Sequence, residues 1–285
     1  MGKKTKKFLI ICGIVVGAGL LLAVIGAAAG GLDDATKLAD HYTWISGPSE
    51  DEEQQLLDSS QTFDSVKVSG DLDLDIVKGN EDSVKLIYPK DSGTYNMDVE
   101  NGTLVVNYDY QKKAIIQLSA EDSTPRLVIT QKDPASIKNI DADLSWGDVD
   151  LEDLTAETVT LTLDDGDADL TRTQIGTLKV DMDYGDLETE SITCGTVAAQ
   201  LDDGDCDLDG TFNGGINVNA SYGDVEIRTK LAESQYTVKA ETNYGDIEVG
   251  GLTREDGGTL HNGTGAYAME LYADDGDISV TFSGQ

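Results

Sequence analysis

Basic residues are scarce in this chain. Of its 285 residues, 20 are Lys or Arg and 54 are Asp or Glu, which gives a formal net charge of −34. Proteins that bind nucleic acids do so largely by neutralising phosphates with clustered Lys and Arg. The composition therefore excludes a nucleic-acid binder of that kind. It also argues against anionic substrates, because the field of the protein would repel them.

Histidine, cysteine and proline are also rare, at two, three and four residues. This leaves little material for zinc sites, haem ligation or a disulfide framework. The sequence contains no Ser/His/Asp set and no phosphate-binding loop. Hydrophobic residues still make up 39% of the chain, so we expect a folded core rather than wholesale disorder.

The N-terminal segment has the pattern of a membrane anchor. A basic cluster at Lys3, Lys4, Lys6 and Lys7 precedes residues 8–31, which carry no charge. A helix of that length is about 36 Å long and spans a ~30 Å hydrocarbon core. The positive-inside rule then predicts a cytoplasmic tail at 1–7 and a single-pass cell-membrane protein with an extracellular C-terminal domain. The alternative is a cleaved signal peptide that ends near Ala27–Ala29.

An acidic extracellular linker is predicted for residues 32–62, and a period-two pattern begins at Phe63. Short runs with alternating or wholly apolar residues are separated by Gly, Asn, Asp and Ser turns, as in Gly70–Ile76 and Leu127–Ile129. No amphipathic helical stretch lies between them. Residues 63–285 are therefore predicted to form an all-β domain.

A Gly-Asp dipeptide recurs every 19 residues in the second half of the chain. Four successive intervals have this length, followed by intervals of 22 and 31, and the glycines are Gly147, Gly166, Gly185, Gly204, Gly223, Gly245 and Gly276. Apolar residues lie two and four positions after most of these glycines, and again twelve to sixteen positions after them. Each period therefore holds two strands, with a turn predicted at positions such as 174–176.

One period cannot bury its apolar faces alone, but stacked periods share a continuous core. The repeat thus predicts a parallel β-solenoid of about 19-residue coils, with 38 residues left open as the alternative coil length. The repeated glycine is expected to supply a positive φ or a tight bend between the two sheets.

The repeat resembles a known family at this point. The run from Phe63 through Val66, Val68 and Gly70-Asp71, together with Tyr95–Leu104, is similar to the DUF4097 β-strand repeat proteins, which are also labelled "putative adhesins". The resemblance covers about residues 63–285. It implies a bacterial surface protein, and some membrane-anchored members belong to cell-envelope stress systems. It transfers no catalytic residue.

Carboxylates follow the repeated glycines and are expected to point outward in rows along the solenoid. Like charges about 5 Å apart repel, so a bound cation would be favourable, and calcium takes six to eight oxygen ligands. The candidate ligands of a structural calcium ion are Asp165, Asp167, Asp169, Asp203, Asp205 and Asp207. The alternative is a solvated, turn-capping face. No other cofactor is expected.

Aromatic residues precede four of the glycines: Trp146, Tyr184, Tyr222 and Tyr244. Stacking along the solenoid is one interpretation, and a platform for sugar rings or cationic peptides is the other. Asp165 and Asp203 alternate with the first three aromatic residues, but Tyr244 interrupts this alternation along the chain.

These observations favour a non-enzymatic, membrane-anchored surface module that acts as an adhesin or in envelope-stress sensing. Its acidic rows would bind cations or a cationic peptide, cell-wall or protein partner, and nucleic acid is excluded. The alternatives are a β-helix enzyme acting on polysaccharides and a passive scaffold for another membrane protein. An enzyme is disfavoured because the carboxylates are spread evenly over the repeats.

Overall fold

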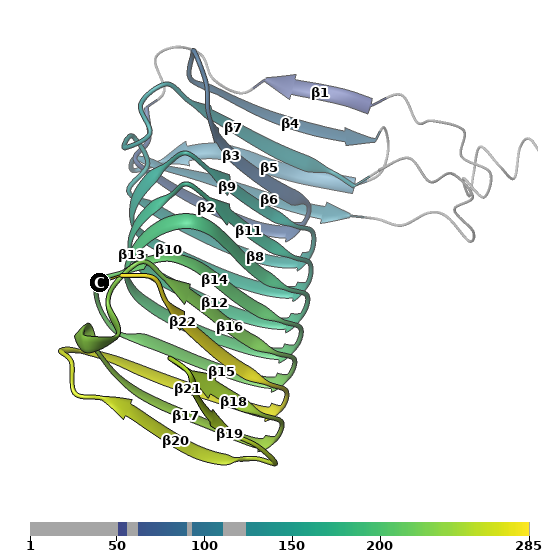
Figure 1. Ribbon diagram of the computed structural model, residues 1–285. Coiled ribbons are helices and arrows are strands. Elements are labelled where there is room, and N and C mark those ends of the chain that lie inside the picture. The colour runs from purple at the N-terminus through teal and green to yellow at the C-terminus, as the bar shows by residue number, and fades with distance from the viewer. Residues whose placement is uncertain (1–50, 56–61, 90–92, 111–123, 285) are drawn as a thin grey trace, which may run out of the picture. The chain divides into compact units, whose positions relative to one another are not determined.

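The computed structural model describes residues 51–55, 62–89, 93–110 and 124–284, which belong to one compact unit. The predicted tail at 1–7 and anchor at 8–31 lie outside these residues, as does most of the predicted linker. Within the described ranges, no helix has the length and apolarity needed to cross a membrane. The described residues are almost entirely strands and turns, which confirms the all-β prediction (Figure 1).

The strands form two faces that enclose the core. The long face is parallel from β6 to β17 and has one antiparallel strand at each end. Its spatial order is β5 (Gly93–Glu100), β6 (Thr103–Tyr110), β2 (Ser65–Asp71), β8 (Asn139–Trp146), β10 (Thr155–Asp165), β12 (Gln174–Tyr184), the second half of β13 (Leu187–Asp203), β15 (Ile216–Tyr222), β21 (Tyr267–Asp275), β17 (Tyr236–Tyr244) and β20 (Gly258–Gly263).

The short face lies opposite and is parallel from β7 to β18. A single 3-10 turn, η2 (Glu233–Gln235), precedes β17. The spatial order of the short face is β1 (Asp51–Gln55), β4 (Ser83–Pro89), β7 (Arg126–Gln131), β3 (Asp73–Lys78), β9 (Val149–Glu152), β11 (Ala168–Thr171), the first part of β13, β14 (Cys206–Phe212), β16 (Val225–Thr229), β22 (Ile278–Phe282), β18 (Ile247–Val249) and β19 (Leu252–Arg254). Residues 51–55 were expected in the linker, and they form β1 instead.

The register fixes the coil length at 19 residues in the regular part of the stack. Thr158 pairs with Thr177, and Thr177 pairs in turn with Thr196. Equivalent residues of successive periods are therefore direct neighbours. A 38-residue coil would place them two strands apart, so that alternative is wrong.

The spatial order of the coils departs from the chain order in two places. The coil made by β21 and β22 lies between the coil of β15 and β16 and the coil of β17 and β18. The coil made by β2 and β3 lies between β6/β7 and β8/β9. Both coils are thus interior layers, although one comes early and the other late in the sequence.

The early coil corrects the alignment of Gly70 with Gly147. The two coils are direct neighbours, and their register shifts at Gly70 and Asp71 so that Leu74 pairs with Val149. Asp73, rather than Asp71, therefore takes the place equivalent to Asp148. The interval of 77 residues reflects the chain between these coils and not four intervening coils.

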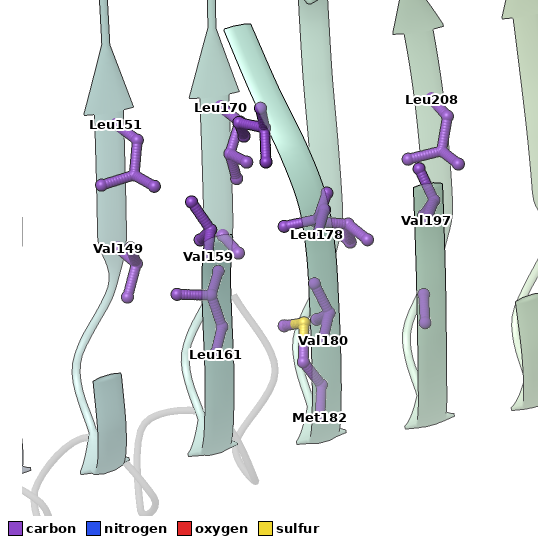
Figure 2. Close-up of a cluster of buried hydrophobic side chains, with 14 of the residues drawn as sticks. Val149, Leu151, Val159, Leu161, Leu170, Leu178, Val180, Met182, Val197 and Leu208 are labelled. Atoms are coloured by element: carbon purple, nitrogen blue, oxygen red, sulfur yellow. The ribbon is translucent and has the colours of Figure 1, made fainter. Parts of the chain in front are cut away.

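The core is built from the predicted apolar positions. Val149 and Leu151 on the short face, and Val159 and Leu161 on the long face, are buried and point between the two faces (Figure 2). Fully burying one such aliphatic side chain contributes ~1.5–3 kcal/mol. Repetition along the stack makes one continuous hydrophobic core.

A third wall of the core was not predicted. The residues expected to form a turn at 174–176 begin strand β12, and Ile175 pairs with Ala156 and Cys194. Cys194 pairs onward with Phe212, and all four of these side chains are buried. The turn is instead made just before this wall, where Asp153, Arg172 and Ser191 adopt positive φ.

Candidate functional site

The Gly-Asp corners join the long face to the short face and lie above one another. Gly166 has a φ of +155°, and a Cβ there would be 2.2 Å from the carbonyl oxygen of Gly147. The same clash, with the carbonyl of the neighbouring corner, recurs at Gly185, Gly204, Gly223, Gly276 and Gly245. Gly276 is the one corner glycine from Gly147 to Gly276 that has no positive φ. The close approach of two backbones therefore requires glycine at these corners as much as the dihedral angle does.

The aspartates after these glycines form a hydrogen-bonded column along the corners. The carboxylate of Asp148 accepts a hydrogen bond of 2.9 Å from the backbone N–H of Asp167, whose own carboxylate accepts one of 2.8 Å from the N–H of Asp186. We call this the aspartate ladder, and in spatial order it comprises Asp73, Asp148, Asp167, Asp186, Asp205, Asp224, Asp277 and Asp246.

The ladder gives these carboxylates a structural role. Each carboxylate satisfies a corner N–H of the next coil, and hydrogen bonds from backbone N–H groups favour the charged form of a carboxylate. Asp71 lies outside this ladder, and its carboxylate accepts a hydrogen bond of 3.2 Å from the N–H of Tyr110. The ladder corresponds to the turn-capping interpretation of the repeated aspartates.

The candidate calcium ligands of one repeat are not brought together. Asp165 ends a strand of the long face, Asp167 belongs to the aspartate ladder, and Asp169 lies in strand β11 of the short face. Asp203, Asp205 and Asp207 are distributed in the same way. Among the described residues, no group of three or more acidic, His or Cys side chains has a geometry that could hold a metal ion. Structural calcium stays a prediction.

A second row of acids runs across the outside of the short face. Register pairs Asp75 with Asp150, Asp150 with Asp169, and so on through the coils to Glu226. Arginines neutralise both ends of this row. Arg126 lies 3.2 Å from Asp75, and Arg228 lies 2.6 Å from both Asp207 and Glu226.

Asp75 is the most perturbed carboxyl group of that row. Burial raises its pKa to about 6, Arg126 opposes the rise, and the neighbouring charge of Asp150 adds to it. Its Oδ1 atom is buried without a hydrogen-bond partner. A shallow hollow of about 370 Å³ lies in front of Asp75, Asp150 and Asp169. Burial also raises the pKa of Asp169, as do the charges of its acidic neighbours.

The positions just before the corner glycines form a different column, which we call the edge column. In spatial order it reads Asp71, Trp146, Asp165, Tyr184, Asp203, Tyr222, Asp275 and Tyr244. Acid and aromatic residues alternate without interruption. Asp275 belongs to the inserted coil and lies between Tyr222 and Tyr244, so the interruption seen along the chain at Tyr244 disappears in space.

The aromatic rings of the edge column face solvent. The exposed fractions are 59% for Trp146, 60% for Tyr184, 59% for Tyr222 and 72% for Tyr244. Strands are ~4.8 Å apart, so neighbouring rings of the column are ~9.6 Å apart. At that separation, with a carboxylate between them, the rings do not stack on one another. The ladder-stacking interpretation is therefore wrong.

The acids of the edge column differ from those of the short face in their counter-ions. Asp165, Asp203 and Asp275 are exposed, and none of them forms an ion pair within the described ranges. The basic side chains that do form ion pairs lie on other surfaces, as in Lys67–Asp141 and Arg228–Asp207. The edge column is thus an anionic and aromatic surface without a cationic partner from the described part of the chain.

The two described cysteines are structural. Cys194 and Cys206 are buried and unpaired, and burial raises their pKa values to about 11 and about 12. Cys206 occupies the small core position predicted from its alignment with Ala168 and Val225. A disulfide between the two, the alternative suggested by the sequence, is not formed.

The fold and the edge column define a class: a β-solenoid with an exposed, acidic recognition edge. Comparison with known proteins places it further. A family model described as "Toastrack DUF4097" matches residues 58–281, and the chain belongs to that family. No curated protein matches the chain.

Solved structures show the same fold at low sequence identity. A "putative adhesin" from Bacteroides fragilis NCTC 9343 has 13% identity and a TM-score of 0.53, with 82% of this chain and 99% of that chain covered. One from Parabacteroides distasonis ATCC 8503 has 9% identity and a TM-score of 0.42, with 82% and 98% covered. A "putative lipid binding protein" from the same organism has 14% identity and a TM-score of 0.37, with 85% and 97% covered. These neighbours are named as adhesins or binding proteins and not as enzymes.

Proposed function

We propose that this protein is a non-enzymatic binding module of the bacterial cell surface, held to the membrane by residues 8–31, which binds cationic partners in adhesion or envelope-stress sensing. The observation that carries the proposal is the edge column, a continuous row of exposed rings and unpaired carboxylates. Rings attract cations through their faces, and a chain of net charge −34 raises the local concentration of cations.

The carboxylates favour binding over catalysis. Polysaccharide hydrolysis requires two carboxyl groups that converge on one bond. In this chain, the three acids of a repeat diverge to three separate surfaces, as with Asp165, Asp167 and Asp169. The same arrangement recurs in neighbouring coils, so no single coil is distinguished as a catalytic centre.

Binding of a labelled polycation tests the proposal. The full-length chain, purified in a non-ionic detergent, is titrated into fluorescent polylysine at ~10 mM and at ~0.5 M salt, and fluorescence anisotropy is recorded. The Debye length falls from ~30 Å at 0.01 M to ~3 Å at 1 M salt, so binding at low salt should weaken strongly at high salt. Fluorescent polyglutamate is the control. Absence of polylysine binding at low salt would refute the proposal.

A further inference from the structure

The edge column has a fixed spatial period. One aromatic residue and one acid occur in every two coils, from Trp146 to Tyr244. Two strand spacings are ~9.6 Å, so the four rings extend over ~29 Å. A linear partner that uses all of them must present a matching group every ~9.6 Å on one side.

The chemistry of each period identifies that group. A ring face attracts a cation, and the carboxylate on the neighbouring strand pairs with the same cation. Arg suits such a site, because its planar guanidinium stacks on a ring and forms bidentate hydrogen bonds with a carboxylate. A neutral sugar would use the rings but would leave Asp165, Asp203 and Asp275 without a counter-ion. Charge complementarity therefore favours a cationic peptide.

The period also distinguishes between peptide conformations. A polyproline II helix has three residues per turn and a rise of ~3.1 Å, so residues i and i+3 share a side at ~9.3 Å. In a β-strand, same-side residues recur at ~6.7 Å or ~13.4 Å, and neither distance matches. In an α-helix, i and i+7 are ~10.5 Å apart, which accumulates ~2.7 Å of error over three intervals against ~0.9 Å for polyproline II.

We propose that the edge column binds a basic peptide in the polyproline II conformation, with Arg or Lys at every third residue. This inference rests on the proposed function and specifies its ligand. Proline at the intermediate positions of such a peptide would lower the entropy lost on binding, because the conformation is already formed in solution.

Peptides of equal charge and composition test the spacing. The full-length chain in non-ionic detergent is titrated into labelled (Arg-Pro-Pro)₄ and into a control peptide with four successive Arg followed by eight Pro. We expect the periodic peptide to bind at least about tenfold more tightly at low salt, because its four cations reach four rings at once. Equal affinities would overturn the inference and leave the proposed function intact. No binding of either peptide, nor of polylysine, would overturn both.

Variants test the surface. Tyr184→Ala combined with Tyr222→Ala should weaken binding of (Arg-Pro-Pro)₄ at least about tenfold and leave the block peptide within about twofold. Both rings are exposed, so the variant should fold, which circular dichroism checks. The matched control is Tyr95→Ala on β5, an exposed aromatic residue outside the edge column. Equal effects of the two variants would overturn the inference.

Carboxylate variants separate local pairing from overall charge. Asp203→Asn with Asp275→Asn removes two acids of the edge column, and Asp143→Asn with Asp181→Asn removes two exposed acids from the outside of the long face. The first pair should weaken periodic binding at least about fivefold more than the second. Equal losses, or binding of neutral oligosaccharides through the tyrosines without peptide binding, would overturn the inference.

Discussion

The corner glycines provide the sharpest test of the stacked-corner geometry, and Gly204→Ala is the variant of choice. Gly204 has a φ of +149°, and a Cβ there would lie 1.9 Å from the carbonyl oxygen of Gly185. The backbone must move, because a carbonyl oxygen cannot yield as a flexible side chain does. Two hydrogen bonds lie in the path of that movement: Gly204 N–H to Tyr222 O at 2.9 Å and Asp205 N–H to the Asp186 carboxylate at 2.7 Å.

The expected destabilisation is the sum of two contributions. Strain of an L-residue at this φ costs ~1–3 kcal/mol. Loss or distortion of the two hydrogen bonds adds ~0.5–1.5 kcal/mol each. We therefore expect the free energy of unfolding to fall by ~2–5 kcal/mol, measured by urea denaturation with far-ultraviolet circular dichroism. Hydrogen exchange should locate the loss of protection in the coils on either side of Gly204, because each coil contacts its neighbours.

Gly251→Ala is the matched control. Gly251 also has a positive φ, +83°, but nothing lies within 4 Å of a Cβ built there. This variant carries conformational strain alone, ~1–2 kcal/mol. If Gly204→Ala is no more destabilising than Gly251→Ala, the close approach of the corners is not what requires glycine, and the reasoning fails.

Three further predictions concern the interior and the short face. Tyr236→Phe should lower the free energy of unfolding by ~1–3 kcal/mol in urea denaturation, because the buried hydroxyl donates to Phe212 O at 2.7 Å; an unchanged midpoint would contradict this. Asp75 has a folded-state pKa of about 6, above the model value of 3.8, so stability should fall as pH rises through this window, and Asp75→Asn should flatten the dependence; urea midpoints at pH 4 to 7 that run parallel would contradict it. Native Cys194 and Cys206 should resist iodoacetamide at pH 8 and react once unfolded in urea, as site-resolved mass spectrometry can measure, and prompt native labelling would be inconsistent with their burial and raised pKa values.

Local patterns in the sequence predict the face on which a residue lies. The 19-residue period places Val159, Leu161 and Leu178 in the core, and the structure confirms this. Glycine at the corners follows from the same spacing. These predictions succeed because burial and turn geometry repeat identically within each coil, so each period states the rule again.

The order of the coils is not encoded in any local pattern. Intervals of 22 and 31 residues precede Gly245 and Gly276, and nothing within those intervals states that the later coil lies before the earlier one in space. The alternation of the edge column, broken along the chain at Tyr244, was the one available signal, since placing Asp275 between Tyr222 and Tyr244 restores it. The third wall at Ile175 was missed because a single apolar residue beside a glycine is also typical of a turn.

The inserted coil of β21 and β22 has a consequence for biosynthesis. Residues 267–282 leave the ribosome after both of the layers that they separate, so those layers cannot close on each other without a register that must later be undone. The seat remains vacant, with unpaired strand edges on both sides, until the last strands arrive. A chain that terminates early would therefore expose two sticky edges in its middle, and such a product is a natural substrate for quality-control proteases.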